Sequence, residues 1–442
     1  MNFYSGGLAE LVSHPTPLTY SFFAHWFTGA TSFGQAMGLL HLPCQKITQP
    51  ILELVDDQLL ISLDTEEKTL YSQTVFSYAP QKDLNAEPVL KTNLKKFLSP
   101  TCLLGTFKHI TTQSGWIAQP KNVISVAQDL VDTIPHFDHQ GDVSAIDQIL
   151  TNEVWPNVIA IGFLAEFFHR YLTKDQSSTD LFWNQISSQV AKRDWFFKSL
   201  AAQSLVKKKE MTLEKYFEEY GLRADNDYEL NSPRWQEIPA FIEERITLTH
   251  FRSDSLPVIP DLPNPSPAIS ALIELQIMRS EARKKTLFYI NKLRQAIIAQ
   301  AGSEETISEL TRAALLGDDK ITPDSVSSTI PIVSPRPVKS VPGGKGLPIS
   351  PGEVEGQAKL ITSTTSNIPQ GVIGIFPNAT PEFTMQYPQC AGIVFLAGGQ
   401  TSHGAIVARE FGIPAVLDQN AAMIPNGSRI SINGTQGSWK IL

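Results

Sequence analysis

A short segment near the C-terminal end of the chain combines residue types that could hold and transfer a phosphoryl group. Gly398 and Gly399 follow an apolar run, and Thr401 and Ser402 can cap a helix whose first turn holds His403. That turn offers free backbone N–H groups and the positive end of a helix dipole, which favour a bound anion. An imidazole is also a nucleophile near neutral pH and can carry a covalent phosphoryl group. The residues alone leave open a second interpretation, in which His403 is a hydrogen-bonding loop histidine.

Four arginines are further candidates for binding a phosphate or a carboxylate. Arg279 and Arg283 are four residues apart on one face of a predicted helix, so they could form a clamp or part of a solvated surface. Arg223 and Arg234 lie close in sequence to two acidic residues, and the group could be a buried ionic network or a substrate site. The acidic residues are Asp227 and Glu229.

Short apolar runs separated by turns surround His403 and predict a small β/α domain. One helix is predicted over 404–411, ending near Gly412, and Asn433-Gly434 is typical of a hairpin turn. Strands are predicted at 357–362, 372–376, 392–396, 413–417, 429–432 and 437–442.

The rest of the chain has a different character. Residues 1–315 are predicted to be mostly helical, most clearly over 271–300, where apolar residues recur at spacings of three and four. Residues 316–346 are rich in Pro, Gly and Ser, which predicts a hinge linker that is flexible at Gly343-Gly344. We therefore predict an α+β multidomain protein, with a mostly helical domain over 1–315 and a β/α domain over 347–442.

Composition excludes several classes of function. Thirty-six Lys and Arg against 44 Asp and Glu give a net charge of −8, which argues against a broad nucleic-acid or anionic-lipid footprint. The three cysteines show no metal-ligand spacing, so no metal site is predicted. The N-terminus lacks the pattern of a signal peptide, and the longest apolar run, 158–168, is too short to span a bilayer. We expect a cytoplasmic protein that binds neither nucleic acid nor membrane.

The 20 residues from Ala397 to Val416 closely resemble the swivelling phosphohistidine domain of the phosphoenolpyruvate-utilising enzymes. The paired glycines, the Ser-His step, Ala-Ile-Val-Ala-Arg-Glu and Gly-Ile-Pro-Ala-Val all stand in this sequence, in a form similar to the rifampicin phosphotransferase and phosphoenolpyruvate synthase-like branch. The resemblance implies a swivelling β/β/α fold for 347–442 and a phosphoacceptor role for His403. It also implies that five residues support the phosphate loop, namely Gly398, Gly399, Thr401, Ser402 and Gly404.

Weaker resemblances to the same branch lie upstream. They are Pro15-Thr16-Pro17-Leu18, the segment from Tyr220 to Trp235 that contains Arg223 and Arg234, and the helix segment from Met278 to Lys284 that contains Arg279 and Arg283. They resemble the middle, substrate-binding domain of those proteins, which implies a substrate-binding role for residues 1–315 and makes the four arginines a possible substrate or phosphate clamp.

The ATP-grasp domain that loads the histidine in this superfamily is not recognised in these 442 residues, and Gly343-Gly344-Lys345 lacks the spacing of a phosphate-binding loop. The resemblance therefore implies that ATP and Mg²⁺ bind to a separate ATP-grasp subunit, with no cofactor held by this chain itself. The predicted function is a phosphotransferase component that carries a phosphoryl group on His403 to a small-molecule acceptor. The alternative is a non-catalytic binding or regulatory protein that has kept the fold. A third option is a carrier charged from phosphoenolpyruvate by another protein.

Overall fold

The chain folds into two units that combine helices and sheets, as the α+β prediction requires. The first comprises residues 1–176, 227–232 and 264–330, and the second comprises 177–226, 233–263 and 331–442. The computed structural model describes residues 3–4, 12, 15–55, 58–79, 90–93, 95–96, 99–135, 141–173, 180–248, 262, 264–303, 307, 310–316, 343–361, 368–369, 371–379, 383, 386–396 and 403–442.

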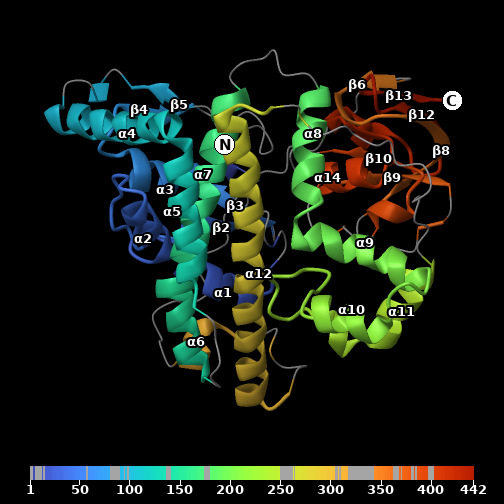
Figure 1. The fold of residues 1–442 in the computed structure, drawn as a ribbon, viewed down its shortest axis with the longest axis horizontal. Helices are drawn as coiled ribbons and strands as arrows, with labels where there is room; N and C mark the ends of the chain where they lie inside the picture. Colours follow the sequence, from blue (N-terminus) through green and yellow to red (C-terminus); the bar gives the residue numbers. More distant parts are fainter. Residues whose placement is uncertain are drawn as a thin grey trace. The chain divides into compact units, whose positions relative to one another are not determined.

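Three long helices lie side by side in the first unit (Figure 1): α5 (Pro120–Thr133), α7 (Trp155–Thr173) and α12 (Pro267–Ala301). The prediction of a helix over 271–300 is confirmed. Ser266 caps α12, and Gly302 ends it with a φ of 78°, a left-handed conformation that glycine adopts without strain. The other helices of this unit are α1 (Pro17–Trp26), α2 (Ser32–Leu39), α3 (Leu63–Glu66), α4 (Pro100–Ala118), α6 (Val143–Ile149) and α13 (Arg312–Leu316), with π-helical turns η2 (Glu67–Tyr71) and η4 (Leu150–Val154).

Short strands also occur in the first unit. One antiparallel sheet has the order β1-β3-β2, and a second pairs β4 with β5. Their bounds are β1 (Phe3–Tyr4), β2 (Leu52–Val55), β3 (Gln58–Ser62), β4 (Phe76–Tyr78) and β5 (Leu90–Thr92).

Four helices in the middle of the sequence group with the C-terminal residues in the second unit, whereas the sequence analysis placed them in the domain over 1–315. They are α8 (Asp180–Ala191), α9 (Trp195–Lys207), α10 (Leu213–Tyr220) and α11 (Pro239–Leu248). Helix α8 packs on α14 (His403–Glu410), the helix of the C-terminal β/α fold. The domain boundaries at 315 and 346 stay a prediction.

The C-terminal residues form an eight-stranded sheet with the order β6-β13-β12-β8-β9-β10-β11-β7. The four strands β8 to β11 run parallel to one another, and all other neighbouring pairs in the sheet are antiparallel. The bounds are β6 (Gly343–Lys345), β7 (Leu347–Ser350), β8 (Glu353–Leu360), β9 (Val372–Phe376), β10 (Gly392–Phe395), β11 (Ala415–Leu417), β12 (Arg429–Asn433) and β13 (Ser438–Ile441). Every strand predicted around His403 is present, as are the helix and the hairpin turn between β12 and β13.

The two ends of this sheet come together. Strands β6 and β7 stand at opposite ends of the strand order, yet only Gly346 separates them in the sequence, so the sheet must curl round on itself. The backbone N–H of Gly346 donates to the Gly437 carbonyl at 2.7 Å, which continues the pairing of β6 with β13 up to the start of β7. The expectation of a flexible linker at Gly343-Gly344 is wrong. These residues pair with β13, and a Cβ on Gly344 would lie 2.7 Å from the Trp439 ring, so glycine lets the strand approach it.

The core of this sheet is aliphatic, with one aromatic ring. Buried side chains of six strands and of the turn after β11 pack together, which accounts for the continuous apolar runs of the parallel strands. They are Ala358, Ile373, Ile375, Val394, Val416, Ala421, Ile424, Ile430, Ile432 and Trp439. Across the described part of the chain, no helix combines the length and the apolar character that crossing a bilayer requires.

Candidate functional site

His403 is the first residue of helix α14, which connects the parallel strands β10 and β11. Such a helix begins at the carboxyl edge of the sheet, the edge where open α/β sheets bind their ligands. The N–H of Gly404 donates to the carbonyl of Ala379, just beyond β9, at 2.9 Å, so the first turn of α14 is held at this edge. Four of the residues predicted to support a phosphate loop, Gly398, Gly399, Thr401 and Ser402, lie outside the described residues.

The first turn of α14 is closely packed at Gly404. A Cβ at this position would lie 2.9 Å from the Phe395 ring, 2.9 Å from the Tyr387 hydroxyl oxygen and 3.0 Å from the Ala379 Cα. Any other residue would have to displace these neighbours, and the Ala379 contact is with backbone. Gly404 therefore sets the position of the helix start, and with it the backbone of His403.

An aromatic cluster underlies this turn. The ring centroids of Phe376 and Tyr387 are 4.8 Å apart, and those of Tyr387 and Phe395 are 5.4 Å apart, both in edge-on arrangements. Phe376 ends β9 and Phe395 ends β10, so the two central parallel strands support the helix start together. The sequence analysis did not single out Tyr387, because it lies in a short 3₁₀ turn with no periodic pattern to mark it.

The other end of α14 is fixed to strand β7. Gly412 has a φ of 60°, and the N–H of Ile413 donates to the Ala408 carbonyl at 2.8 Å, which is the bonding of a Schellman cap. The buried Arg409 side chain donates through Nη1 to the Ile349 carbonyl at 3.2 Å, and Ser350 Oγ donates to the Ala408 carbonyl at 3.3 Å. Both ends of the helix that begins with His403 are thus fixed by the sheet.

In the first unit, two of the upstream segments meet. The Glu229 carboxylate accepts hydrogen bonds from Thr16 N at 3.0 Å, Thr16 Oγ1 at 2.8 Å and Thr19 Oγ1 at 2.6 Å. A buried carboxylate at the N-terminus of α1 satisfies free backbone donors and favours the helix dipole. The contacts of Glu229 are therefore those of a structural clamp on α1.

Arg223 and Arg234 lie within the packed helices of the second unit. The Arg223 guanidinium donates to the Phe196 carbonyl at 3.1 Å and to Ser199 Oγ at 2.5 Å, and lies 4.8 Å from the Trp235 ring. Arg234 is fully buried, and its backbone N–H donates to Glu237 Oε2 at 2.8 Å. The side-chain contacts of Arg223 favour its structural interpretation. The role of Arg223 and Arg234 in a substrate clamp stays a prediction.

Arg279 and Arg283 share a face of α12, as predicted, and each has a neighbour in the first unit. The Arg283 guanidinium lies over the Tyr228 ring, with Nε 3.3 Å from the Tyr228 hydroxyl. Arg279 acts on Glu166 of α7. Burial raises the pKa of the Glu166 carboxyl, but Arg170, His169 and Arg279 together hold that pKa below its usual value. The pair is thus engaged with an aromatic ring and a carboxylate, and its role as a phosphate clamp stays a prediction.

A polar cluster that the sequence did not predict surrounds Glu66 at the end of α3. The Tyr78 hydroxyl donates to Glu66 Oε2 at 3.0 Å, and burial raises the pKa of the Glu66 carboxyl. Burial also raises the pKa of Tyr71 to about 12, so the phenol stays protonated. The cluster includes Arg170 of α7 and lies beside the buried His109 of α4, whose ring is 5.7 Å from that of Tyr71. Glu66, Tyr71 and Tyr78 are near in sequence but belong to different elements, and His109 and Arg170 come from distant helices, which is why no motif marks the cluster.

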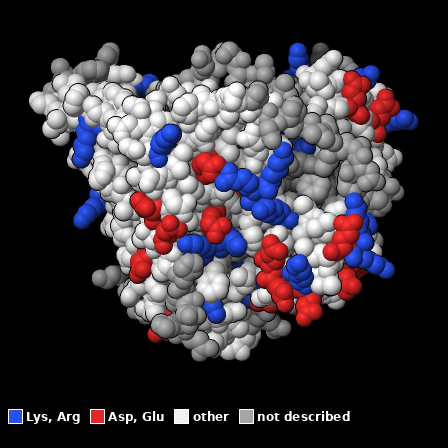
Figure 2. All heavy atoms as spheres, in the orientation of Figure 1, with Lys and Arg blue, Asp and Glu red and all other residues white. Residues whose placement is uncertain are grey.

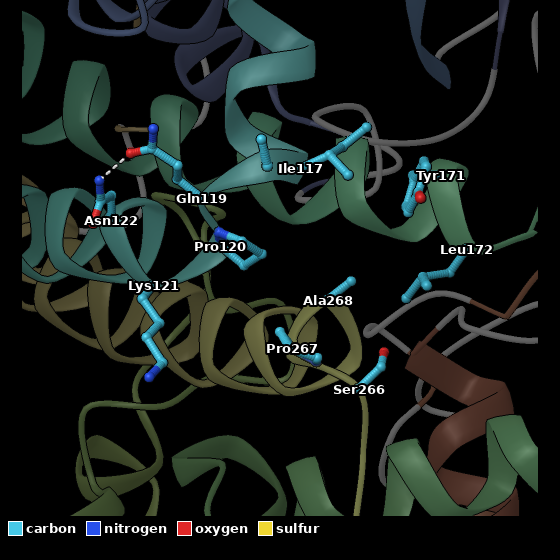
Figure 3. Close-up of a pocket in the computed structure, with 11 residues that line it drawn as sticks. Ile117, Gln119, Pro120, Lys121, Asn122, Tyr171, Leu172, Ser266, Pro267 and Ala268 are labelled. Carbon is cyan, nitrogen blue, oxygen red and sulfur yellow. Dashed lines mark hydrogen bonds between the residues drawn. The ribbon is translucent and has the colours of Figure 1, made fainter.

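A cavity of about 920 Å³ opens where four helix ends of the first unit meet. Figure 3 shows Ile117 from the end of α4, Pro120 from the start of α5, Leu172 from the end of α7 and Ala268 from the start of α12 around it. Among the described residues, no group of three His, Cys, Asp or Glu side chains is arranged to hold a metal ion.

The comparison with protein families bears on the segment around His403. Residues 368–437, which include α14 and four strands of the curled sheet, match the family model described as "PEP-utilising enzyme, mobile domain". This segment is therefore similar to the mobile domain of PEP-utilising enzymes, and it is called the mobile domain below. The resemblance stated from the sequence is thereby confirmed.

Curated relatives match over the same C-terminal part of the chain as this mobile domain. Rifampicin phosphotransferase of Bacillus cereus is 39% identical over 100 residues, which cover 22% of this chain and 12% of the relative. Its counterpart in Bacillus subtilis is 37% identical over 108 residues, covering 23% and 12%. A probable phosphoenolpyruvate synthase of Archaeoglobus fulgidus is 36% identical over 97 residues, covering 21% and 13%.

The matched segment spans only about an eighth of the length of these relatives. The mobile domain is therefore what the chain shares with them, and their whole activities do not transfer with it. A solved structure, the solution NMR structure of a UPF0107 protein, matches 23% of this chain and 98% of its own at 16% identity and a TM-score of 0.19.

Proposed function

We propose that this chain is a phosphotransferase component that carries a phosphoryl group on His403 to a small-molecule acceptor. The observation that supports this most is the place of His403, which starts α14 at the carboxyl edge of four parallel strands inside the matched mobile domain. The free N–H groups of a helix start favour a phosphoryl group there. The fixed first turn, with Gly404 packed on Phe395 and Tyr387, supplies the positioning that phosphoryl transfer needs.

The proposed reaction has two steps. In the first, an imidazole nitrogen of His403 forms an N–P bond as the bond between the phosphoryl group and its donor oxygen breaks. In the second, a hydroxyl oxygen of the acceptor forms an O–P bond as the N–P bond breaks, and the hydroxyl proton ends on the imidazole nitrogen. The histidine is regenerated, and one phosphate ester is formed for each phosphoryl group loaded.

We assign the phosphoryl donor to ATP, bound with Mg²⁺ on a separate ATP-grasp subunit. By analogy with the superfamily, the β-phosphoryl group of ATP would be the one transferred. The one Gly-Gly-Lys of this sequence, Gly343–Lys345, forms the strand β6 and is paired with β13, which is not the geometry of a loop that cradles phosphates. The linker that the sequence predicts before β6 would let the mobile domain move between the donor and the acceptor.

The test is acid-labile, alkali-stable labelling of the purified chain with β-labelled ATP, alone and with a lysate of the source organism. We expect label on the wild type only with lysate, and none on His403→Ala. The matched control is His41→Asn, which changes an exposed histidine whose φ of 57° asparagine tolerates. Equal labelling of His403→Ala and wild type would refute the carrier role.

The second candidate is a non-catalytic binding or regulatory protein. The structural contacts of Arg223 and Glu229 favour it, because both candidate residues are engaged in packing. Absence of label under every donor condition, including phosphoenolpyruvate, would favour this candidate.

A further inference from the structure

The cavity of the first unit is lined by groups that favour an apolar, uncharged ligand. Six of its eleven described lining residues are apolar: Ile117, Ala118, Pro120, Leu172, Pro267 and Ala268. The other five are Gln119, Lys121, Asn122, Tyr171 and Ser266. No carboxylate stands among the described lining residues. Their one cation, Lys121, extends away from the other lining side chains in Figure 3. A volume of about 920 Å³ is within the usual range for sites that hold drug-sized molecules.

The helix ends leave few backbone donors at this cavity. Helices α5 and α12 both begin with proline at their first position, so each lacks one of the N–H groups that would otherwise face an anion. The side chains of Gln119 and Asn122 are hydrogen-bonded to each other. The helix starts here thus differ from a phosphate site, which would present free N–H groups.

Two hydroxyl groups remain to orient a ligand. Ser266 Oγ accepts a hydrogen bond from Ile269 N at 3.4 Å, which uses an oxygen lone pair and leaves its own proton available to donate. Tyr171 is 40% exposed and turns its phenol toward the side of the cavity where Ser266 lies (Figure 3). Two neutral hydroxyls suit a partner that also carries a hydroxyl or carbonyl, because an ionised group would be left without a countercharge.

We propose that this cavity binds an apolar small molecule that bears a hydroxyl group, and that this hydroxyl is the phosphoryl acceptor. The inference rests on the proposed carrier role of His403, since only a phosphoryl carrier requires an acceptor. The apolar body of the acceptor lies against Ile117, Leu172 and Ala268, and Ser266 and Tyr171 orient its polar end. The acceptor class is thereby an apolar alcohol or phenol, rather than a sugar or an organic acid.

The first experiment measures the ligand class with two probes, 2-naphthol and naphthalene-2-sulfonate, by isothermal titration calorimetry. We expect 2-naphthol to bind at one site, at least tenfold more tightly than the sulfonate. Ala268→Trp fills the cavity and should weaken 2-naphthol binding at least tenfold. The matched control is Ala299→Trp, at an exposed position of the same helix, for which we expect unchanged binding.

A second variant covers the case in which Ala268→Trp folds poorly. Leu172→Asp places a charge on the opposite wall of the cavity and should also weaken 2-naphthol binding. Equal affinity of wild type and both cavity variants, or tighter binding of the sulfonate, would overturn the ligand class.

The second experiment measures transfer and separates this inference from the proposed function. Chains labelled at His403 are incubated with a small-molecule extract of the source organism, and labelled products are resolved by thin-layer chromatography. Wild type and Ala299→Trp should yield a labelled organic product, whereas Ala268→Trp should label normally at His403 and yield inorganic phosphate only. Normal product from Ala268→Trp would overturn the acceptor site while leaving the carrier role intact. If neither the wild type nor any variant were labelled at His403, the carrier role itself would be overturned, and with it the acceptor assignment.

Discussion

The mobile domain and the helical first unit use helix N-termini in opposite ways. Helix α14 begins with the polar residue His403 on a backbone that Gly404 packs tightly against Phe395 and Tyr387. Helices α5 and α12 begin with proline and line an apolar cavity. One arrangement suits a phosphoryl group held by N–H donors, and the other suits an uncharged molecule. The proposed carrier residue and the proposed acceptor cavity thus lie in different units, each beside the kind of helix start that its ligand would require.

The largest effect should follow from substituting the glycine that fixes the start of α14. Gly404→Val places a side chain in contact with the Ala379 backbone, so we expect a loss of about 1–3 kcal/mol in the free energy of unfolding and little or no label on His403. Urea unfolding and the labelling assay measure the two effects. The matched control in the first unit is Gly162→Ala in α7, where no atom lies within 4 Å of an added Cβ. It should gain about 0.5–1 kcal/mol, because alanine is the better helix former. An unchanged Gly404→Val chain would refute the packing argument.

A smaller loss should follow from weakening the clamp on α1. Glu229→Gln removes the charge from three short hydrogen bonds to Thr16 and Thr19, so we expect about 1–2 kcal/mol of destabilisation by urea unfolding. Glu281→Gln, at an exposed position of α12, is the control and should be neutral. If Glu229→Gln instead abolished transfer from labelled His403 at unchanged stability, the structural assignment of Glu229 would be wrong.

The two regions should respond alike where they share a feature. Gly302 ends α12 and Gly412 ends α14, both with positive φ, at 78° and 60°. Alanine at either position should cost about 1 kcal/mol through left-handed strain. Only Gly412→Ala should slow the labelling of His403, because that cap belongs to α14. Slower labelling of Gly302→Ala would show that the C-terminal end of α12 influences the reactivity of His403, although the two lie in different units.

The smallest effect concerns pH and belongs to the first unit alone. Burial raises the folded-state pKa of Glu66 above its ordinary value of 4.5, so the folded chain binds this proton more tightly than the unfolded chain does. The contribution of Glu66 to stability is therefore fully present below about pH 4.5 and falls as the pH rises through the folded-state pKa. Glu66→Gln should flatten this fall in urea-unfolding curves measured from pH 4 to 8, without altering the labelling of His403. A steeper fall in the variant would contradict the assigned direction.

The predictions that succeeded concern short, local patterns. Alternating turns and apolar runs located the strands around His403, and the spacing of Leu287, Ile290 and Leu293 located α12, because these signals lie within one element. The strand at Gly343–Lys345 was not predicted from the sequence. Its glycines are needed because the strand packs closely on Trp439, and Trp439 lies almost 100 residues later in the chain. The Glu66–Tyr78 cluster, Tyr387 and the cavity were missed for the same reason. Each depends on which elements pack together, and no local spacing records that.

The central claim is that His403 carries the phosphoryl group, and locating the phosphate on the chain tests it most directly. Chains charged with ATP and lysate would be examined by ³¹P NMR under alkaline conditions and by tandem mass spectrometry of the peptide that contains α14. We predict one phosphoramidate resonance and a phosphate on His403, both absent from His403→Ala and present in His41→Asn. A phosphoramidate that persists in His403→Ala, or a phosphate that maps to another residue, would contradict the account.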